Sequence, residues 1–170
     1  MASSSDAVEA ITLTGKEVSA SIDAYLFDAL YSVDGIFTKG NQMEASIVSN
    51  NKVRIADGLL INQGHFLRIK PGMYCDVPIE NGTQNMKHCD CIVAQFKIDE
   101  SGESHDIVVI QGTPGEQETV PSLTKDDLEN GGALRQIELF RVHLNGINIS
   151  GVDRIARTVN SFSDAIFYKG

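Results

Sequence analysis

The spacing of apolar residues changes once along this 170-residue chain, and that change limits the fold more than any other feature. Near the N-terminus, apolar side chains recur every three or four positions, which is the period of one helix face. From Glu44 onward they alternate with polar side chains, as in half-buried β-strands. The sequence therefore predicts one helix over residues 20–32 and a β-rich remainder. The apolar stripe of that helix consists of Ile22, Tyr25, Leu26, Ala29 and Leu30.

Turn-forming residues divide the remainder into short strands. Ser49-Asn50-Asn51 and Asn62-Gln63-Gly64 predict hairpin turns. A polar loop over residues 99–103 joins the two most apolar strands, residues 91–96 and 107–110, into a further hairpin. About eight such strands with closely spaced turns are typical of an antiparallel β-sandwich or barrel-like domain. We therefore expect a mainly β chain with the N-terminal helix packed on it or beside it.

A short second helix is predicted near residues 124–130. Thr124 would be its N-cap, and Asp126 and Asp127 occupy the first turn, where the helix dipole favours acidic groups. Gly131-Gly132 would end it. This helix follows an irregular crossing loop.

The ends of the chain differ in composition from its centre. Residues 1–10 are small, polar and acidic and predict a flexible tail, whereas residues 11–155 form the β-rich structural domain. Residues 156–170 are ambiguous between strand and helix, and their apolar side chains predict a docking segment.

The overall composition excludes several classes of function. A net charge of −9 gives a surface that repels phosphate backbones, so nucleic acid is not an expected partner. The chain holds no run of about 18 apolar residues that would cross a membrane, and its N-terminus is not a signal peptide. With only 3 cysteines, a disulfide scaffold is not expected and folding in a reducing cytoplasm is.

The side chains best suited to bind a metal or to react are clustered around Cys89 and Cys91. Two positions apart on a strand, these thiols share one face, while His88 and Asp90 share the other. We interpret the cysteines as buried strand residues; a metal site with Cys75 as third ligand, or a redox pair, are the alternatives. No catalytic, cofactor-binding or metal site is predicted. The histidines are expected at solvent-facing strand positions: His65, His88, His105 and His143.

Short motifs also follow one another in a recognisable order. Each is weak alone, and it is the order that carries information. The motifs are Asp57-Gly58, Gln63-Gly64, Asn81-Gly82-Thr83, Asp90-Cys91-Ile92-Val93-Ala94, Ile107-Val108-Val109-Ile110-Gln111-Gly112-Thr113-Pro114, Val120-Pro121-Ser122-Leu123-Thr124, Leu139-Phe140-Arg141-Val142 and Val152-Asp153-Arg154.

This order resembles the small β-rich structural proteins of tailed bacteriophages and of prophages of Gram-positive bacteria, over residues 11–155. The resemblance implies a non-enzymatic virion protein of the tail or baseplate, assembled in the host bacterial cytoplasm. It also implies many copies with three- or six-fold symmetry. The family often continues into a shaft or sugar-binding head, whereas this chain ends at Gly170, which favours an adaptor or attachment subunit.

The expected partners are further copies of the chain, as a trimer or hexameric ring, and neighbouring virion proteins. A capsid decoration or head-fibre protein is the first alternative. A carbohydrate-binding or carbohydrate-active domain is the second, and it is disfavoured by the absence of Trp and an aromatic content of 6%. The candidate inter-subunit contacts are Ile22, Leu26, Leu30, Phe162, Ile166 and Phe167.

Overall fold

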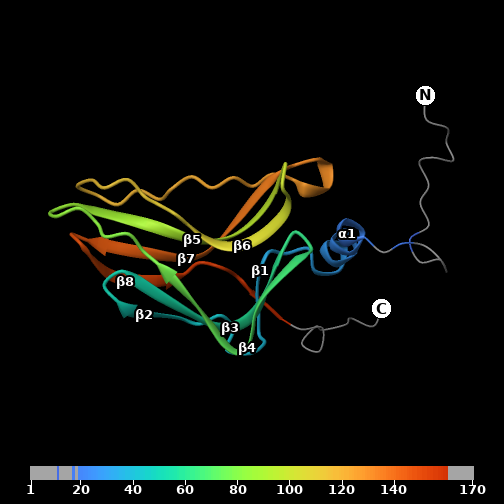
Figure 1. Ribbon diagram of the computed structural model, residues 1–170, viewed down its shortest axis with the longest axis horizontal. Coiled ribbons are helices and arrows are strands. Elements are labelled where there is room, and N and C mark those ends of the chain that lie inside the picture. The colour runs from blue at the N-terminus through green and yellow to red at the C-terminus, as the bar shows by residue number, and fades with distance from the viewer. Residues whose placement is uncertain (1–10, 12–16, 18, 161–170) are drawn as a thin grey trace, which may run out of the picture.

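The computed structural model describes residues 11, 17 and 19–160. In this part of the chain, one α-helix precedes a mainly β body of two antiparallel-rich sheets, as predicted. The helix lies at one end of an elongated molecule (Figure 1). The elements are α1 (Ala20–Tyr31), β1 (Gly35–Phe37), β2 (Ala45–Ser49), β3 (Lys52–Asn62), β4 (His65–Pro78), β5 (Lys87–Asp99), β6 (Gly102–Ile110), the 3₁₀ turn η1 (Leu128–Asn130), β7 (Leu134–Asn145), β8 (Asn148–Arg154) and β9 (Thr158–Val159).

The N-terminal helix begins and ends at clear capping residues. The Ser19 side chain accepts a hydrogen bond from the Ile22 N–H at 3.2 Å, which satisfies a donor in the first turn. Ser32 adopts a left-handed conformation with φ of 50° and donates its N–H to the Asp28 carbonyl, which ends the helix. The helix predicted over residues 20–32 is therefore confirmed.

The first sheet is built around the long strand β3. β2 and then β1 pair with one edge of β3, β9 extends that side beyond β1, and β4 pairs with the other edge. Pro71-Gly72, a dipeptide typical of turns, does not end a strand. Instead it is a bulge, because the pairing of β4 shifts from Ile69 opposite Gly58 to Tyr74 opposite Ala56.

The second sheet has the order β6-β5-β7-β8, with antiparallel neighbours throughout. The predicted apolar hairpin is present as β5 and β6, with Cys91 opposite Ile110 and Asp99 opposite Gly102. A bulge between Ile92 and Val93 shifts the pairing of β5 with β7.

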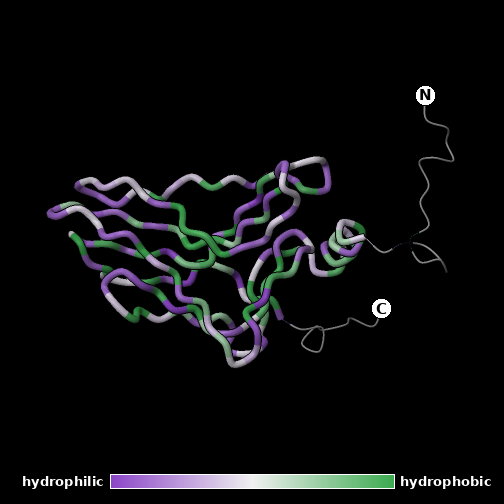
Figure 2. Tube along the Cα trace, viewed as in Figure 1, coloured by the Kyte–Doolittle hydropathy of each residue, from purple (hydrophilic) through white to green (hydrophobic). Residues whose placement is uncertain are grey.

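One hydrophobic core joins the two sheets. Figure 2 shows apolar residues concentrated in the strands of the body. A smaller cluster, in which Phe37, Ile61 and Val159 are buried, lies beside the end of α1 that bears Tyr31. The main core is formed by Ile36, Met43, Val53, Ile55, Leu60, Val77 and Ile79 from the first half of the chain and by Ile92, Ala94, Ile137, Leu139, Phe140, Val142 and Leu144 from the second.

Residues 111–127, here called the crossing segment, run as irregular chain alongside the second sheet (Figure 1). The short helix predicted near residues 124–130 is largely wrong. Thr124 exchanges hydrogen bonds with Gln136, and Lys125 bridges to Arg135, so this stretch is extended along β7. Only Leu128–Asn130 forms a helical turn, and its N-cap is Asp127 rather than Thr124.

The C-terminal segment joins the first sheet where the structure describes it. β9 pairs in parallel with β1, with Ile36 opposite Thr158 and Phe37 opposite Val159. Val159 is buried in the smaller cluster. The predicted tail over residues 1–10 and the candidate contacts Phe162, Ile166 and Phe167 lie outside the described residues.

Candidate functional site

Helix α1 rests on the body through one narrow line of side chains. Within the helix, all of which the structure describes, Ala24 alone is buried. Phe27 packs edge-to-face on Phe66 with ring centroids 4.8 Å apart, and Tyr31 packs on Phe37 at 5.1 Å. Ala24, Phe27 and Tyr31 therefore form the seat of α1, at positions i, i+3 and i+7 of one helix face.

The predicted apolar stripe of α1 faces away from this seat. Leu30 is 60% exposed, Tyr25 is 55% exposed and Leu26 is 37% exposed. Ala29 is exposed as well, and Ile22 is partly buried. The helix thus has apolar residues on both faces, an arrangement typical of helices that are covered on both sides. Ile22, Leu26 and Leu30 are brought together on this outer face.

Grooves on both sides make α1 a ridge. One groove, of about 350 Å³, lies between α1, the start of β4 and the start of β6. The other, of about 270 Å³, lies between α1 and η1. Between them the tip of the β3–β4 hairpin touches the helix so closely that a Cβ on Gly64 would lie 1.8 Å from the Ala24 carbonyl oxygen.

Several acidic residues lie on and beside this ridge. Asp23 and Asp28 lie on α1, which carries no basic residue in its last turn. Glu103 lines one groove and Glu129 lines the other. Partial desolvation raises the pKa of Glu129, and the nearby charges of Asp28 and Asp127 add to that rise.

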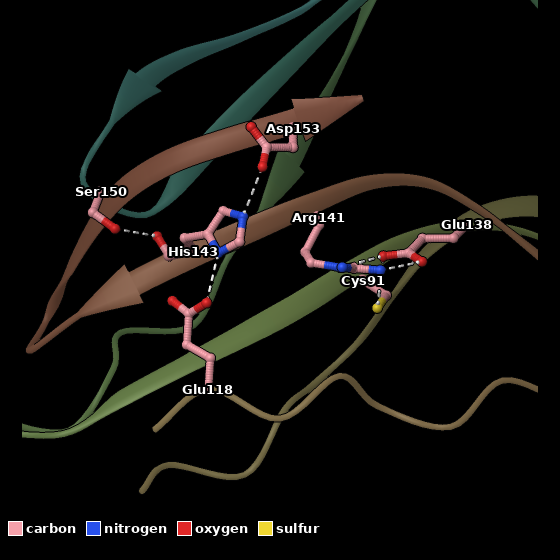
Figure 3. Close-up of polar contacts among 7 residues, drawn as sticks. All are labelled: Cys91, Glu118, Glu138, Arg141, His143, Ser150 and Asp153. Atoms are coloured by element: carbon pink, nitrogen blue, oxygen red, sulfur yellow. Dashed lines mark hydrogen bonds and ion pairs between the residues drawn. The ribbon is translucent and has the colours of Figure 1, made fainter. Parts of the chain in front are cut away.

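A second polar cluster lies on the outer side of β7, where the crossing segment meets the sheet (Figure 3). The His143 ring contacts Glu118 of the crossing segment at 2.8 Å and Asp153 of β8 at 3.1 Å. Burial alone would lower the pKa of His143, but the hydrogen bonds and charges of both carboxylates outweigh burial and raise that pKa. The His143 ring therefore joins the crossing segment to β8 through Glu118 and Asp153.

The other groups of this cluster are engaged in structural contacts. Arg141 forms a two-pronged ion pair with Glu138 at 2.9 Å, and the Cys91 thiol donates to the same carboxylate at 3.2 Å. Burial and the Glu138 carboxylate raise the pKa of Cys91 to about 12, so this thiol stays protonated. The Ser150 hydroxyl donates to the His143 main-chain carbonyl rather than to its ring. These contacts hold β5, β7, β8 and the crossing segment together.

Cys89 and Cys91 are buried, as predicted, but they lie on the side of the crossing segment. The Cys89 thiol donates to the Thr119 carbonyl at 3.4 Å. The expectation for His88 was wrong: it is only 5% exposed and contacts Asp90 at 3.4 Å. His65 and His105 are partly buried, with ring centroids 4.0 and 5.5 Å from that of Phe96. Burial and the nearby His65 lower the pKa of His105 to about 4.

Asp90 anchors the start of the crossing segment. Its buried carboxylate accepts a hydrogen bond from the Gly112 N–H at 2.9 Å. Burial raises the pKa of Asp90, and the Gly112 N–H partly offsets that rise by stabilising the charged form. A Cβ on Gly112 would lie 2.1 Å from the Cys89 carbonyl oxygen, so the chain crosses β5 at a point where only glycine fits.

The sequence did not reveal the His143 cluster. Glu118 and Asp153 lie 25 and 10 positions from His143, and no local pattern signals such contacts. In residues 11, 17 and 19–160, no group of three or more His, Cys, Asp or Glu side chains is arranged to hold a metal ion. No helix among those residues is long and apolar enough to cross a membrane.

No protein-family model matches the chain, and no curated protein is significantly similar to it. The outer face of α1 is thus the best-supported candidate for a binding surface. It is a ridge of apolar side chains, flanked by two grooves, that the described part of the chain leaves exposed.

Proposed function

We propose that this protein is a non-enzymatic structural subunit of a phage tail or baseplate, which attaches to neighbouring subunits through α1. The role comes from the resemblance in motif order over residues 11–155. The observation that carries the attachment is the outer apolar stripe of α1, with Tyr25, Leu26 and Leu30 exposed. Burial of apolar surface stabilises a contact by roughly 25 cal/mol per Å², so such a stripe favours a covered state.

The arrangement of the sheets suits this role. The two sheets share one core, and we infer that they form a β-sandwich-like scaffold with α1 at one end. Such a scaffold holds the helix at a fixed place on the molecule, because Ala24, Phe27 and Tyr31 seat it on the body. The apolar ridge of α1 is thereby presented at one end of the molecule, where a neighbouring subunit could cover it (Figure 1).

Purified particles of the phage or prophage that encodes this chain provide the test. An antibody against the chain, imaged on those particles, should label the tail tip or baseplate. Label on the head instead would favour the capsid decoration or head-fibre alternative. A chain that is absent from purified particles by mass spectrometry would refute the structural role.

A matched pair of variants tests the attachment surface. Leu26→Asp on the α1 stripe should lower the copy number in particles at least tenfold, because it places a charge in the contact. Glu100→Gln, in the exposed β5–β6 turn on a polar loop, should leave the copy number unchanged. If both variants are incorporated like the wild type, α1 is not the attachment surface.

A further inference from the structure

Two histidines line the groove between α1, β4 and β6, and they are called the histidine pair. His65 is the first residue of β4 and directly follows the turn that touches the helix. His105 lies on β6, opposite Phe96 of β5. Both imidazoles share the groove with Ala24 and Phe27, two of the three residues that seat α1. Movement of α1 away from the body would therefore open both rings to water.

Phe96 shields one side of each imidazole. Its ring centroid lies 4.0 Å from that of His65 and 5.5 Å from that of His105. Phe96 itself is only 5% exposed, so the contacts among the three rings are shielded from solvent. The histidine pair is thus enclosed by the body on one side and faces α1 across the groove on the other.

The hydrogen bonds of His105 suit a neutral ring. The ring donates to the Phe66 main chain, while its Nε2 is buried and has no hydrogen-bond partner among residues 11, 17 and 19–160. Protonation would make both ring nitrogens donors and would leave the N–H at Nε2 without an acceptor. Burying a charged ring with an unpaired donor costs far more free energy than burying a neutral one. The packing of His105 therefore disfavours the imidazolium.

Phe66 connects His105 to the seat of α1. Its main chain accepts the hydrogen bond of the His105 ring, and its side chain carries Phe27 of α1 edge-to-face at 4.8 Å. The Tyr31 ring of α1 lies 6.4 Å from the same side chain. A charge on His105 would thus act on the residue against which the helix rests.

The charged groups around the histidine pair compensate only part of this cost. Glu103 opposes the fall in the pKa of His65, and Asp106 opposes that of His105, yet burial outweighs both. By contrast, His143 contacts two carboxylates, and its pKa is raised. The other charged groups on the elements around the pair are Asp23 of α1, Glu129 of η1, and Arg135 of β7, which is paired with Asp34.

We propose that the histidine pair is a pH-sensitive switch for α1. While both rings are neutral, the helix stays on its seat, and protonation in mildly acidic solution favours a state in which α1 has moved off the body. In that state water solvates His65 and His105 and removes the cost of charging them. If α1 attaches the chain to a neighbour, acid also loosens that attachment, and this consequence alone rests on the proposed function.

The direction of the effect follows from proton linkage. The pKa of His105 is about 4 with α1 in place and returns toward about 6.5 in water. Between these two values the open state binds a proton that the closed state does not, so opening becomes more favourable as the pH falls. Above the upper value both states are neutral at this ring, and pH has no effect through it.

Hydrogen exchange of the α1 amides in the free chain at pH 7 and pH 5 tests the switch. Exchange rates are first corrected for their intrinsic dependence on pH. The protection of α1 should then fall at least about tenfold from pH 7 to pH 5, while β5 and β7 keep their protection. An equal fall in all three elements would mean that acid unfolds the whole chain, and no fall in α1 would mean that the pair does not act on the helix.

A double variant assigns the effect to the histidine pair. His65→Gln combined with His105→Gln keeps polar side chains that do not titrate, so the fall in α1 protection between the two pH values should disappear. His143→Gln is the matched control, because it removes a strand histidine outside the groove and should leave the fall unchanged. Circular dichroism first establishes that both variants are folded. A fall that persists in the double variant would assign it to carboxylates such as Asp23 or Glu103 and overturn the proposal.

Titration of the His105 ring in the wild type gives a measurement that needs no variant. Its proton chemical shifts, followed by NMR from pH 8 to pH 4, should report a pKa well below that of His143. An ordinary pKa near 6.5 would overturn the switch. Because all of these measurements use the free chain, their outcome is independent of whether the chain is found in purified particles.

Discussion

Helix α1 and the crossing segment both lie outside the two sheets, but they are attached in opposite ways. α1 is regular, yet only Ala24 of this helix is buried, and Phe27 and Tyr31 seat it through ring contacts with Phe66 and Phe37. The crossing segment is irregular, yet hydrogen bonds and an ion pair tie it to the second sheet from Gly112 to Asp126. Regular secondary structure therefore does not measure how firmly an element is held.

The difference lies in which surfaces remain for other molecules. The crossing segment uses its polar groups within the chain, and each such hydrogen bond contributes about 1 kcal/mol net. α1 leaves an apolar stripe exposed, and burying it would contribute roughly 25 cal/mol per Å². The crossing segment is therefore part of the scaffold, and α1 is the part that is available for a partner.

The largest expected effect comes from forcing the crossing segment off β5. Gly112→Ala places a Cβ 2.1 Å from the Cys89 carbonyl oxygen, and neither backbone can yield without breaking contacts. We expect the free energy of unfolding to fall by about 3 kcal/mol in urea titrations. The control is Gly115→Ala, whose nearest neighbour would be 3.5 Å away. Equal losses in the two variants would contradict the role assigned to Gly112.

The sequence predicted those elements whose apolar or turn-forming residues follow a regular local pattern. The stripe period identified α1 and its outer residues, and the turn residues identified the β2–β3 and β5–β6 hairpins. The stripe also singled out Ile22, Leu26 and Leu30, which the structure brings together on one face. The sequence analysis did not identify the seat. Ala24 is small, and Phe27 and Tyr31 each directly follow a residue of the stripe, so the two faces cannot be separated by apolar spacing alone.

The sequence did not predict what depends on contacts between distant residues. Thr124 has the features of a helix cap, but its pairing with Gln136 keeps the chain extended. His143 has an ordinary strand context, and only the fold brings Glu118 and Asp153 to its ring. Local preference is a weak guide wherever tertiary hydrogen bonds compete with it.

A smaller effect should follow from lifting α1 off its seat. Gly64→Ala places a Cβ 1.8 Å from the Ala24 carbonyl oxygen, and α1, which is seated by side chains rather than by strand pairing, shifts more easily than a paired strand. We expect a loss of about 2 kcal/mol. Hydrogen exchange should become faster in the α1 amides while β5 and β7 stay protected.

Gly72→Ala separates backbone strain from this clash. Gly72 has a φ of +75°, close to the +76° of Gly64, but nothing lies within 4 Å of its Cβ position. The free energy of unfolding should therefore fall by only about 1 kcal/mol, from backbone strain, and hydrogen exchange in the α1 amides should stay unchanged. Faster α1 exchange in Gly72→Ala would show that the seat at Gly64 is not what holds the helix.

The contacts of His143 with Glu118 and Asp153 should contribute stability that depends on pH. Its pKa is raised in the folded protein, so the contribution is present below the unfolded pKa of about 6.5 and is lost as pH rises through the higher folded value. His143→Gln should cost about 1 kcal/mol at pH 6 and close to nothing at pH 9, since its partners are partly solvated. Unfolding of both proteins at each pH checks this, and a cost that grows with pH would contradict it.

The smallest effect tests whether the α1 stripe is free within the chain. Leu30→Gln keeps a good helix former and removes an exposed apolar side chain, so the isolated protein should change by less than about 0.5 kcal/mol. Phe27→Ala, on the seat, should cost about 2 kcal/mol because it loses the packing on Phe66. Both are measured at low concentration, where self-association adds nothing to stability. A large loss in Leu30→Gln under those conditions would mean that another part of the same chain already covers the stripe.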